Sequence, residues 1–337
     1  MISLGCSLHF ARAPPSPARR ASPAAKRKVH STRPPSSPVT SSSRHSGPCC
    51  AIASRPCASS RKPPPAGTAT KALADPNAYD LAALNEPQRK ALIRFWEQWQ
   101  ESLKTLRILD PACGSGAFLI EAFDQLHTHY EVSNARLEEL RGHRTLFDLD
   151  RQILQHNLYG ADLNAEAIQI CQLSLWIKTA AHGKRLTSLD HSIREGNSVV
   201  SDPAVHPKAF DWHAAFPEVF AQGGFDVVVG NPPYIRQEWI APYKPYWEQR
   251  YRSYHGVADI FVYFFEQGIE LLRPGGQLAF ITSGSWVRGN FGAPLRKVLS
   301  TDARMTSMVD FGEFQPFDDA EMIRPLDHHR HQRRARR

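Results

Sequence analysis

The residues best suited to chemistry are Asn231, Pro232, Pro233 and Tyr234, which read N-P-P-Y directly after the apolar run F-D-V-V-V-G. The proline that follows Asn231 restricts it to extended geometry, so its side-chain oxygen and the Pro232 carbonyl can converge on one point as acceptors. A planar NH2 group fits between two such acceptors, and the Tyr234 ring gives a base or an amide a surface for stacking. The motif therefore predicts a site for a planar amine, although an ordinary loop after a strand has the same composition.

A second stretch with chemical potential is D-P-A-C-G-S-G, which runs from Asp110 to Gly116. It lies between a short apolar run, Leu106 to Leu109, and an amphipathic pattern that predicts a helix from Ala117 to Tyr130. A glycine-containing turn between a strand and a helix lets the backbone approach a ligand closely. The turn is not the G-x-G-x-x-G fingerprint of dinucleotide sites, and Asp110 suits a cationic amino group. The competing interpretation is a helix-capping turn of any α/β protein.

Two further polar positions follow expected strands. Asp162 ends the run Leu158 to Ala161, where an acidic side chain can accept hydrogen bonds from ribose hydroxyls or lie at the N-terminus of the next helix. Asp162 lies further along the chain from Asp110 than the ribose-binding acid of a dinucleotide site usually lies from its glycine-rich turn. A charged helical insertion at 131–156 accounts for the additional residues. Asn197, in the turn G-N-S after a third expected strand, is placed to lie beside an adenine ring.

The elements that must position these residues alternate between strands and helices. After the strand at 227–229 we expect a helix over Asp259 to Leu272 and strands over Gln277 to Thr282 and Met305 to Phe311. This order predicts an α/β fold with a doubly wound, mostly parallel sheet. Ligands of such sheets bind at the carboxyl edge of the strands, which is where all the polar turns fall.

The segment Ile235 to His255 interleaves aromatic and basic side chains. Rings and cations in alternation suit a nucleic-acid strand, and half-buried loop packing explains them nearly as well. Both interpretations stay open at the level of sequence.

The two ends differ in composition from the middle. Residues 1–74 contain no Asp or Glu, and hold twelve of the 41 Lys and Arg, twelve of the 26 prolines and four of the six cysteines, so we expect a disordered basic tail. It could be a nucleic-acid-binding tail, a transit peptide or a stretch foreign to the folded domain, the last being preferred. Residues 324–337 form a second basic tail, rich in His.

Without the two tails, the net charge of the chain changes from positive to negative. The segment Asp75 to Ile323 carries 23 Lys and Arg against 32 Asp and Glu, so the basic pI does not indicate a DNA-binding face. No apolar run approaches the length of a membrane span, and Cys113 and Cys171 are expected to be lone intracellular thiols.

Taken in order, the motifs resemble a known family. D-P-A-C-G-S-G-A-F, N-L-Y-G-A-D-L-N, G-N-S, F-D-V-V-V-G-N-P-P-Y-I-R, A-D-I-F-V-Y-F-F-E-Q-G and G-G-Q-L-A-F-I-T-S together resemble the S-adenosylmethionine-dependent N6-adenine DNA methyltransferases of type IIG restriction-modification and phage-defence systems. The resemblance covers about residues 103–323 and implies a Rossmann-like methyltransferase domain at 75–323 in a bacterial or archaeal cytoplasm. It implies double-stranded DNA as the partner.

The resemblance also implies roles for single residues. S-adenosylmethionine would be bound by Asp110, Pro111, Ala112, Gly114, Gly116, Asp162 and Asn197. Asn231, Pro232 and Pro233 would hold the target amino group and Tyr234 would stack on the base. Arg236 and either Phe317 or Phe314 would add substrate contacts. No metal is implied.

The chain departs from the family at both ends. The family has a cofactor-binding segment upstream and a target-recognition domain downstream, so we expect a fragment that lacks its specificity and nuclease parts. A methyltransferase acting on RNA bases or protein glutamine, or a non-catalytic cofactor-binding remnant, remains the alternative.

Overall fold

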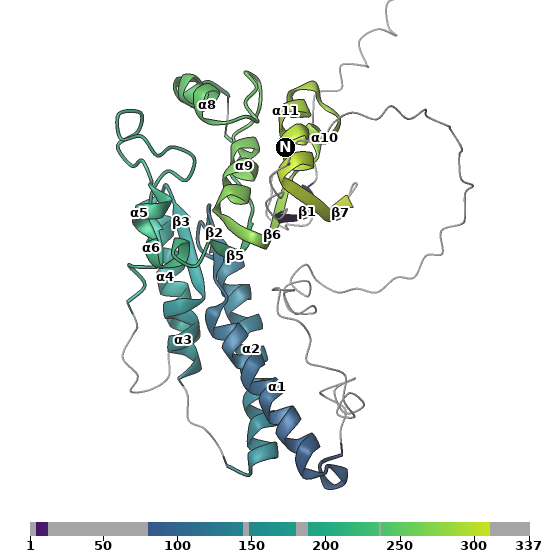
Figure 1. The fold of residues 1–337 in the computed structure, drawn as a ribbon. Coiled ribbons are helices and arrows are strands. Elements are labelled where there is room, and N and C mark those ends of the chain that lie inside the picture. The colour runs from purple at the N-terminus through teal and green to yellow at the C-terminus, as the bar shows by residue number, and fades with distance from the viewer. Residues whose placement is uncertain (1–4, 13–79, 144–147, 180–187, 236, 311–337) are drawn as a thin grey trace, which may run out of the picture.

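The computed structural model describes residues 5–12, 80–143, 148–179, 188–235 and 237–310 (Figure 1). Its strands are β1 (Gly5–Arg12), β2 (Ile108–Asp110), β3 (Leu158–Asp162), β4 (Ile193–Glu195), β5 (Phe225–Gly230), β6 (Leu272–Ser283) and β7 (Ala303–Asp310). The longer helices are α1 (Glu86–Thr105), α2 (Ala117–Arg141), α3 (Leu149–His156), α4 (Ala165–Thr179), α8 (Lys244–Arg250), α9 (Phe261–Leu271) and α11 (Ala293–Asp302). Short helices are η3 (Leu81–Ala83), α5 (Trp212–Ala215), α6 (Pro217–Phe220), α7 (Gln237–Ile240), η4 (Ala241–Tyr243), α10 (Ser285–Arg288) and η5 (Asn290–Gly292).

The strands form one sheet in the order β4-β3-β2-β5-β6-β1-β7. The five strands from β4 to β6 run parallel, and β1 pairs antiparallel with both β6 and β7. The strand order reverses between β2 and β5, whose carboxyl ends carry D-P-A-C-G-S-G and N-P-P-Y. The predicted doubly wound, mostly parallel α/β fold is confirmed.

Two hydrophobic clusters cover the two faces of the sheet, because neighbouring strand residues point to opposite sides. Leu109 and Val228 belong to the cluster under α9 and α11, whereas Ile108 and Val227 belong to the cluster under α2 and α4. A sheet buried on both faces explains why its strands read as continuous apolar runs.

The region predicted as a charged helical insertion at 131–156 continues α2 to Arg141 and then forms α3. In this part Leu137 and Leu140 pack with Leu92 and Trp96 of α1 in a small separate core. Figure 1 shows α1 and α2 running side by side away from the sheet. The insertion is therefore a helical extension that packs against α1, and its described residues add no strand to the sheet.

Two expectations need correction. Residues 5–12 are not disordered, because they form β1 between the facing edges of β6 and β7, where an extended segment pairs with backbone groups on both sides. The strand expected to begin at Gln277 begins at Leu272 instead, because Leu272 pairs with Phe225 of β5. The rest of the 1–74 tail, and the tail at 324–337, lie outside the described residues.

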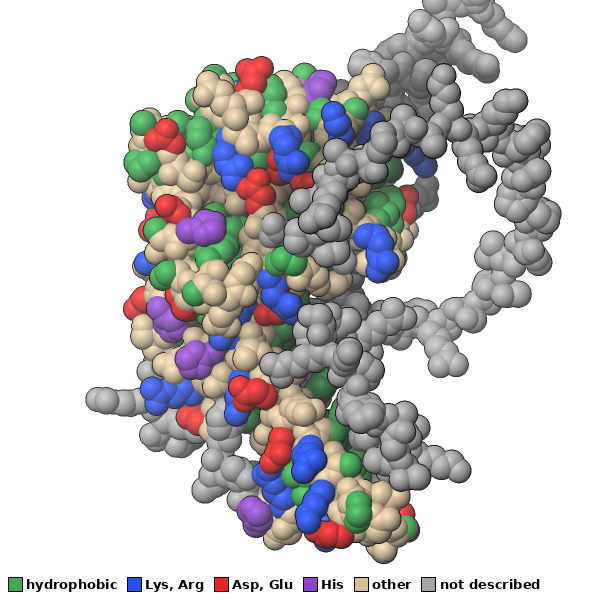
Figure 2. Space-filling model, viewed as in Figure 1, with side chains coloured by type: hydrophobic (Ala, Val, Ile, Leu, Met, Phe, Trp, Pro, Cys, Tyr) green, Lys and Arg blue, Asp and Glu red, His purple; other side chains and the backbone are tan. Residues whose placement is uncertain are grey.

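The described residues on the face drawn in Figure 2 form no large basic patch of the kind that would indicate a nucleic-acid interface. Figure 2 shows acidic, basic and hydrophobic side chains interspersed over the described part of one face. Among the described residues, no helix has the length and apolarity needed to cross a membrane.

Candidate functional site

The turn after β2 is built around a buried carboxylate. Asp110 is 1% exposed, and its Oδ1 accepts a hydrogen bond from the Ala112 amide at 3.0 Å. The turn ends at Gly116, which has a φ of 92° and precedes α2 directly. A side chain at Gly116 would bring its Cβ within 2.6 Å of the Cys171 sulfur, so only glycine fits there.

Burial sets the protonation of Asp110. Desolvation is the main cause that raises its pKa, to about 7, and the nearby Asp162 carboxylate adds to the increase. The hydrogen bond from Ala112 acts in the opposite direction. A strongly shifted carboxyl at the carboxyl edge of an α/β sheet is a frequent mark of a ligand site.

Asp162, at the end of β3, accepts hydrogen bonds from the turn after β2 and from the turn before α4. Its Oδ2 accepts from the Gly114 amide at 2.9 Å, and its Oδ1 accepts from the Asn164 amide at 2.9 Å. The helix-terminal role expected as its alternative belongs instead to Asn164, whose Oδ1 accepts from the Glu166 amide at 2.8 Å. An Asn immediately before a predicted helix is a recognisable N-cap signal, which the sequence-based prediction missed.

The N-P-P-Y loop begins against the same carboxylate. A Cβ added to Gly230, the last residue of β5, would lie 2.7 Å from Asp110 Oδ1. The structure therefore brings the two predicted turns together across adjacent strands β2 and β5.

Asn231 carries an unmatched acceptor. Its Oδ1 is buried and has no hydrogen-bond partner among the described residues. Pro232 is buried, while Pro233 and Tyr234 are half-buried, and the Tyr234 ring lies 6.0 Å from the Phe261 ring of α9. A buried acceptor without a donor is costly in a folded protein, which makes Asn231 a candidate for a ligand contact.

The G-N-S turn reaches the first loop from the other side. Asn197 is 9% exposed, and its Oδ1 accepts from the Val199 amide at 3.2 Å. The Ser198 hydroxyl donates to the Pro111 carbonyl at 2.5 Å. The predicted residues Asp110, Pro111, Ala112, Gly114, Gly116, Asp162 and Asn197 thus lie in one connected set of loops.

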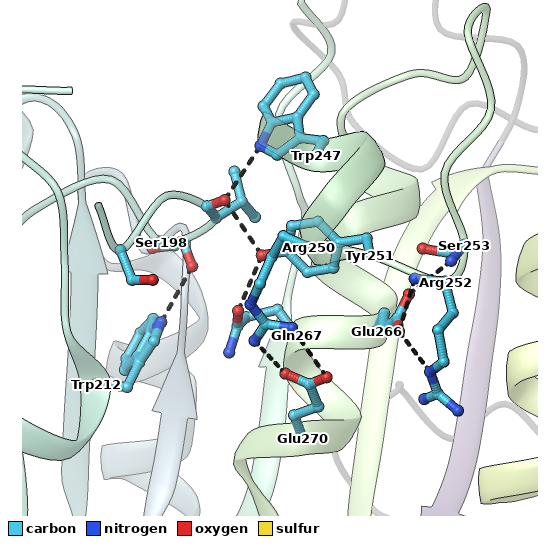
Figure 3. A network of polar contacts seen from close by, with 12 residues as sticks. Ser198, Trp212, Trp247, Arg250, Tyr251, Arg252, Ser253, Glu266, Gln267 and Glu270 are labelled. Atoms are coloured by element: carbon cyan, nitrogen blue, oxygen red, sulfur yellow. Dashed lines mark hydrogen bonds and ion pairs between the residues drawn. The ribbon is translucent and has the colours of Figure 1, made fainter. Parts of the chain in front are cut away.

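Several side chains of the aromatic and basic segment after the N-P-P-Y loop are buried or form ion pairs within the chain (Figure 3). Trp247 and Tyr251 are 1% and 3% exposed, Arg250 pairs with Glu270, and Arg252 pairs with Glu266 and Asp302. These contacts favour the loop-packing interpretation for this part of the segment. Trp239, in contrast, is 74% exposed.

Cys113 and Cys171 are free thiols, as expected, and they contact each other. Both are buried, and a hydrogen bond between their side chains is the first cause of a raised Cys113 pKa, with burial second. This contact joins the turn after β2 to α4. Arg236, Phe314 and Phe317, and the His cluster at 328–331, lie outside the described residues.

Comparisons with known proteins find similarity to restriction-modification and methyltransferase families. The family described as Eco57I restriction-modification methylase matches residues 156–317, and the family described as RMKL-like methyltransferase domain matches residues 83–203. The type II restriction enzyme and methyltransferase RM.Eco57I of Escherichia coli is 31% identical over 63% of this chain. This chain is therefore similar to type II restriction-modification methyltransferases.

Two further relatives carry informative names. The type II methyltransferase M.PaeR7I of Pseudomonas aeruginosa is 37% identical over 64% of this chain, and the adenine-specific methyltransferase BrxX of Escherichia coli O9:H4 (strain HS) is 32% identical over 25% of it. The matched region spans 23% of RM.Eco57I, 34% of M.PaeR7I and 6% of BrxX.

Proposed function

We propose that this chain is the catalytic part of a DNA methyltransferase that transfers a methyl group from S-adenosylmethionine to N6 of adenine in a restriction-modification or phage-defence system. The observation that carries the proposal is the buried Oδ1 of Asn231, which has no hydrogen-bond partner among the described residues and directly follows Gly230, the residue that lies against Asp110. The N6 amino group of adenine is a planar donor that would satisfy this acceptor.

The residues of the first loop fit the proposed cofactor. A buried carboxyl with a pKa of about 7 gains a counter-charge when a cationic amino group binds beside it, so Asp110 suits the methionine end. Asp162, at the end of β3, would face the ribose hydroxyls, and Asn197 would lie near the adenine ring of the cofactor. Pro111, Ala112, Gly114 and Gly116 would border the methionine part through their backbone.

When bound, S-adenosylmethionine supplies a methyl group activated by its sulfonium. Asn231 Oδ1 and the Pro232 carbonyl would accept the two N–H groups of the target amine, orient its nitrogen for in-line attack and stabilise the positive charge that develops there. Pro233 keeps the loop stiff, and Tyr234 would stack on the flipped base. Flipping an adenine from a duplex costs a few kcal/mol, which stacking offsets in part.

DNA is preferred over the other planar substrates on two grounds. RM.Eco57I is named a type II restriction enzyme and methyltransferase, M.PaeR7I is named a type II methyltransferase, and BrxX is named an adenine-specific methyltransferase. An RNA base or a protein glutamine presents a similar planar NH2 group, so the experiment must include both.

The test compares the full chain with Asn231→Ala. Unmethylated bacterial genomic DNA, RNA and a glutamine peptide are incubated with labelled S-adenosylmethionine, products are identified by mass spectrometry, and cofactor affinity is measured by titration calorimetry. We expect N6-methyladenine in DNA from the wild type, none from Asn231→Ala, and equal cofactor affinity for both.

Asn290→Ala, the same change at an exposed residue of η5, is the matched control and should methylate normally. Cofactor binding without transfer to any substrate would overturn the catalytic proposal, and transfer only to RNA or peptide would overturn the choice of DNA.

A further inference from the structure

The backbone that follows Asn197 is held by four aromatic side chains from two distant segments. Trp212 Nε1 donates to the Ser198 carbonyl at 3.0 Å, and Trp247 Nε1 donates to the Val199 carbonyl at 3.1 Å. The Ser201 amide donates to the Tyr246 hydroxyl at 3.1 Å. The fourth side chain is Tyr251, whose hydroxyl also contacts the Val199 carbonyl.

The Val199 carbonyl receives two of these side chains. The Tyr251 hydroxyl lies 3.2 Å from this oxygen and 2.9 Å from Gln267 Oε1 of α9, so its proton is shared between two buried acceptors. The Trp247 and Tyr251 rings also pack on the Tyr263 ring, at 4.5 Å and 5.3 Å between centroids. Figure 3 shows the Trp247 and Tyr251 side chains, and its dashed lines include their hydrogen bonds to the Val199 carbonyl.

The segment that carries these rings is itself fixed to α9. Glu266, 1% exposed, accepts from the Arg252 amide at 3.2 Å, from Arg252 Nε at 3.0 Å and from the Ser253 amide at 2.8 Å. Arg250 makes a two-pronged ion pair with Glu270 at 3.2 Å and 2.5 Å. A buried carboxylate with three donors and a bidentate arginine pair gives this segment little freedom.

On its other side, the same loop contacts the turn after β2. The Val199 amide donates to Asn197 Oδ1, and the Ser198 hydroxyl donates to the Pro111 carbonyl. A shift of the Val199 carbonyl would therefore move both Asn197 and the contact to Pro111.

We propose that Trp247 and Tyr251 are positioning residues that hold residues 197–201 against Pro111 and so set the affinity for the cofactor. On this view, residues 246–253 serve the cofactor site, although they follow the N-P-P-Y loop in the chain and read as nucleic-acid contacts in the sequence. The inference rests on the proposed function, because it takes residues 110–116 and 197 as the cofactor site.

The decisive variant is Tyr251→Phe in the full chain, which keeps the ring and removes the hydroxyl. Tyr254→Phe is the matched control, because its ring also packs on Tyr263 and, among the described residues, no hydrogen bond joins its hydroxyl to 198–201. We expect Tyr251→Phe to raise the cofactor Kd about fivefold, the effect of losing roughly one hydrogen bond. The apparent KM for cofactor should rise equally, with kcat and DNA affinity unchanged.

A second measurement does not depend on the cofactor. Hydrogen exchange of the Val199, Val200 and Ser201 amides should be faster in Tyr251→Phe than in the wild type or Tyr254→Phe, without added ligand. Trp247→Phe should accelerate the same amides.

The outcomes separate the two proposals. Unchanged exchange at 199–201 shows that Tyr251 does not hold the loop, and faster exchange with unchanged cofactor affinity shows that holding it does not set binding; either result overturns the inference. A wild type that binds no cofactor overturns the proposed function and with it the affinity half of the inference, while the exchange comparison still decides whether Tyr251 holds the loop.

Discussion

Replacing Asp110 by asparagine should raise the stability of the folded protein and weaken the binding of the ligand. The Asp110 pKa rises from 3.8 to about 7 on folding, mainly through burial. The folded protein therefore holds this proton more tightly than the unfolded chain does. The contribution of Asp110 to stability is accordingly greatest below about pH 4, falls as the pH rises toward 7, and is constant above it.

The size of the effect follows from the shift. About three pKa units correspond to about 4 kcal/mol at pH 8, as an upper limit, because each unit is worth about 1.4 kcal/mol. The amide that replaces the carboxyl carries no charge and retains an oxygen that can accept from Ala112. We expect Asp110→Asn to be more stable than the wild type by up to about 4 kcal/mol at pH 8, by about 1–2 kcal/mol at pH 5, and by little below pH 4.

Urea unfolding of both proteins between pH 4 and 8 measures the difference directly, and calorimetric titration of S-adenosylmethionine measures binding. The stabilised variant should lose most of its cofactor affinity. In the wild type, affinity should increase as the pH rises through about 7, because the cationic amino group needs the ionised carboxylate. A stability difference that does not change with pH would refute the assignment of the pKa shift to burial, and full cofactor affinity in Asp110→Asn would refute the role of the carboxylate.

Three other perturbations test separate parts of the structure. Tyr234→Ala should weaken DNA binding by about 1–3 kcal/mol, as measured by fluorescence anisotropy, and unchanged binding and turnover would count against stacking. Trp239→Ala should leave the cofactor Kd and the melting temperature unchanged because this ring is 74% exposed, yet weaken DNA binding; an unaltered DNA Kd would exclude Trp239 from the interface. Deleting residues 1–12 removes β1, which pairs with both β6 and β7, and should lower the melting temperature by more than about 4 °C, whereas a disordered segment could be deleted without effect.

The central part of the fold was predictable because each strand end coincides with a turn of unusual composition. Asp110 and Gly230 end β2 and β5, and parallel strands place such ends at one edge, so the meeting of the two motifs followed from the topology. The position of β1 was not predictable in this way, since its partners are more than 250 residues distant in the sequence. Gly5–Arg12 form a strand because they pair with both β6 and β7, and that pairing depends on the folded structure and not on the local sequence.

The segment from Tyr246 to Ser253 shows why composition alone leaves function open. Aromatic rings and guanidinium groups give the same sequence pattern in two cases. They can contact the bases and phosphates of a nucleic acid, or they can contact the carbonyls and carboxylates of their own chain. The buried carboxylate of Glu266 decides between these outcomes, because it requires donors that Arg252 and Ser253 supply. In the same segment Trp247 and Tyr251 donate hydrogen bonds to the Val199 carbonyl, so these polar groups too contact the backbone of their own chain.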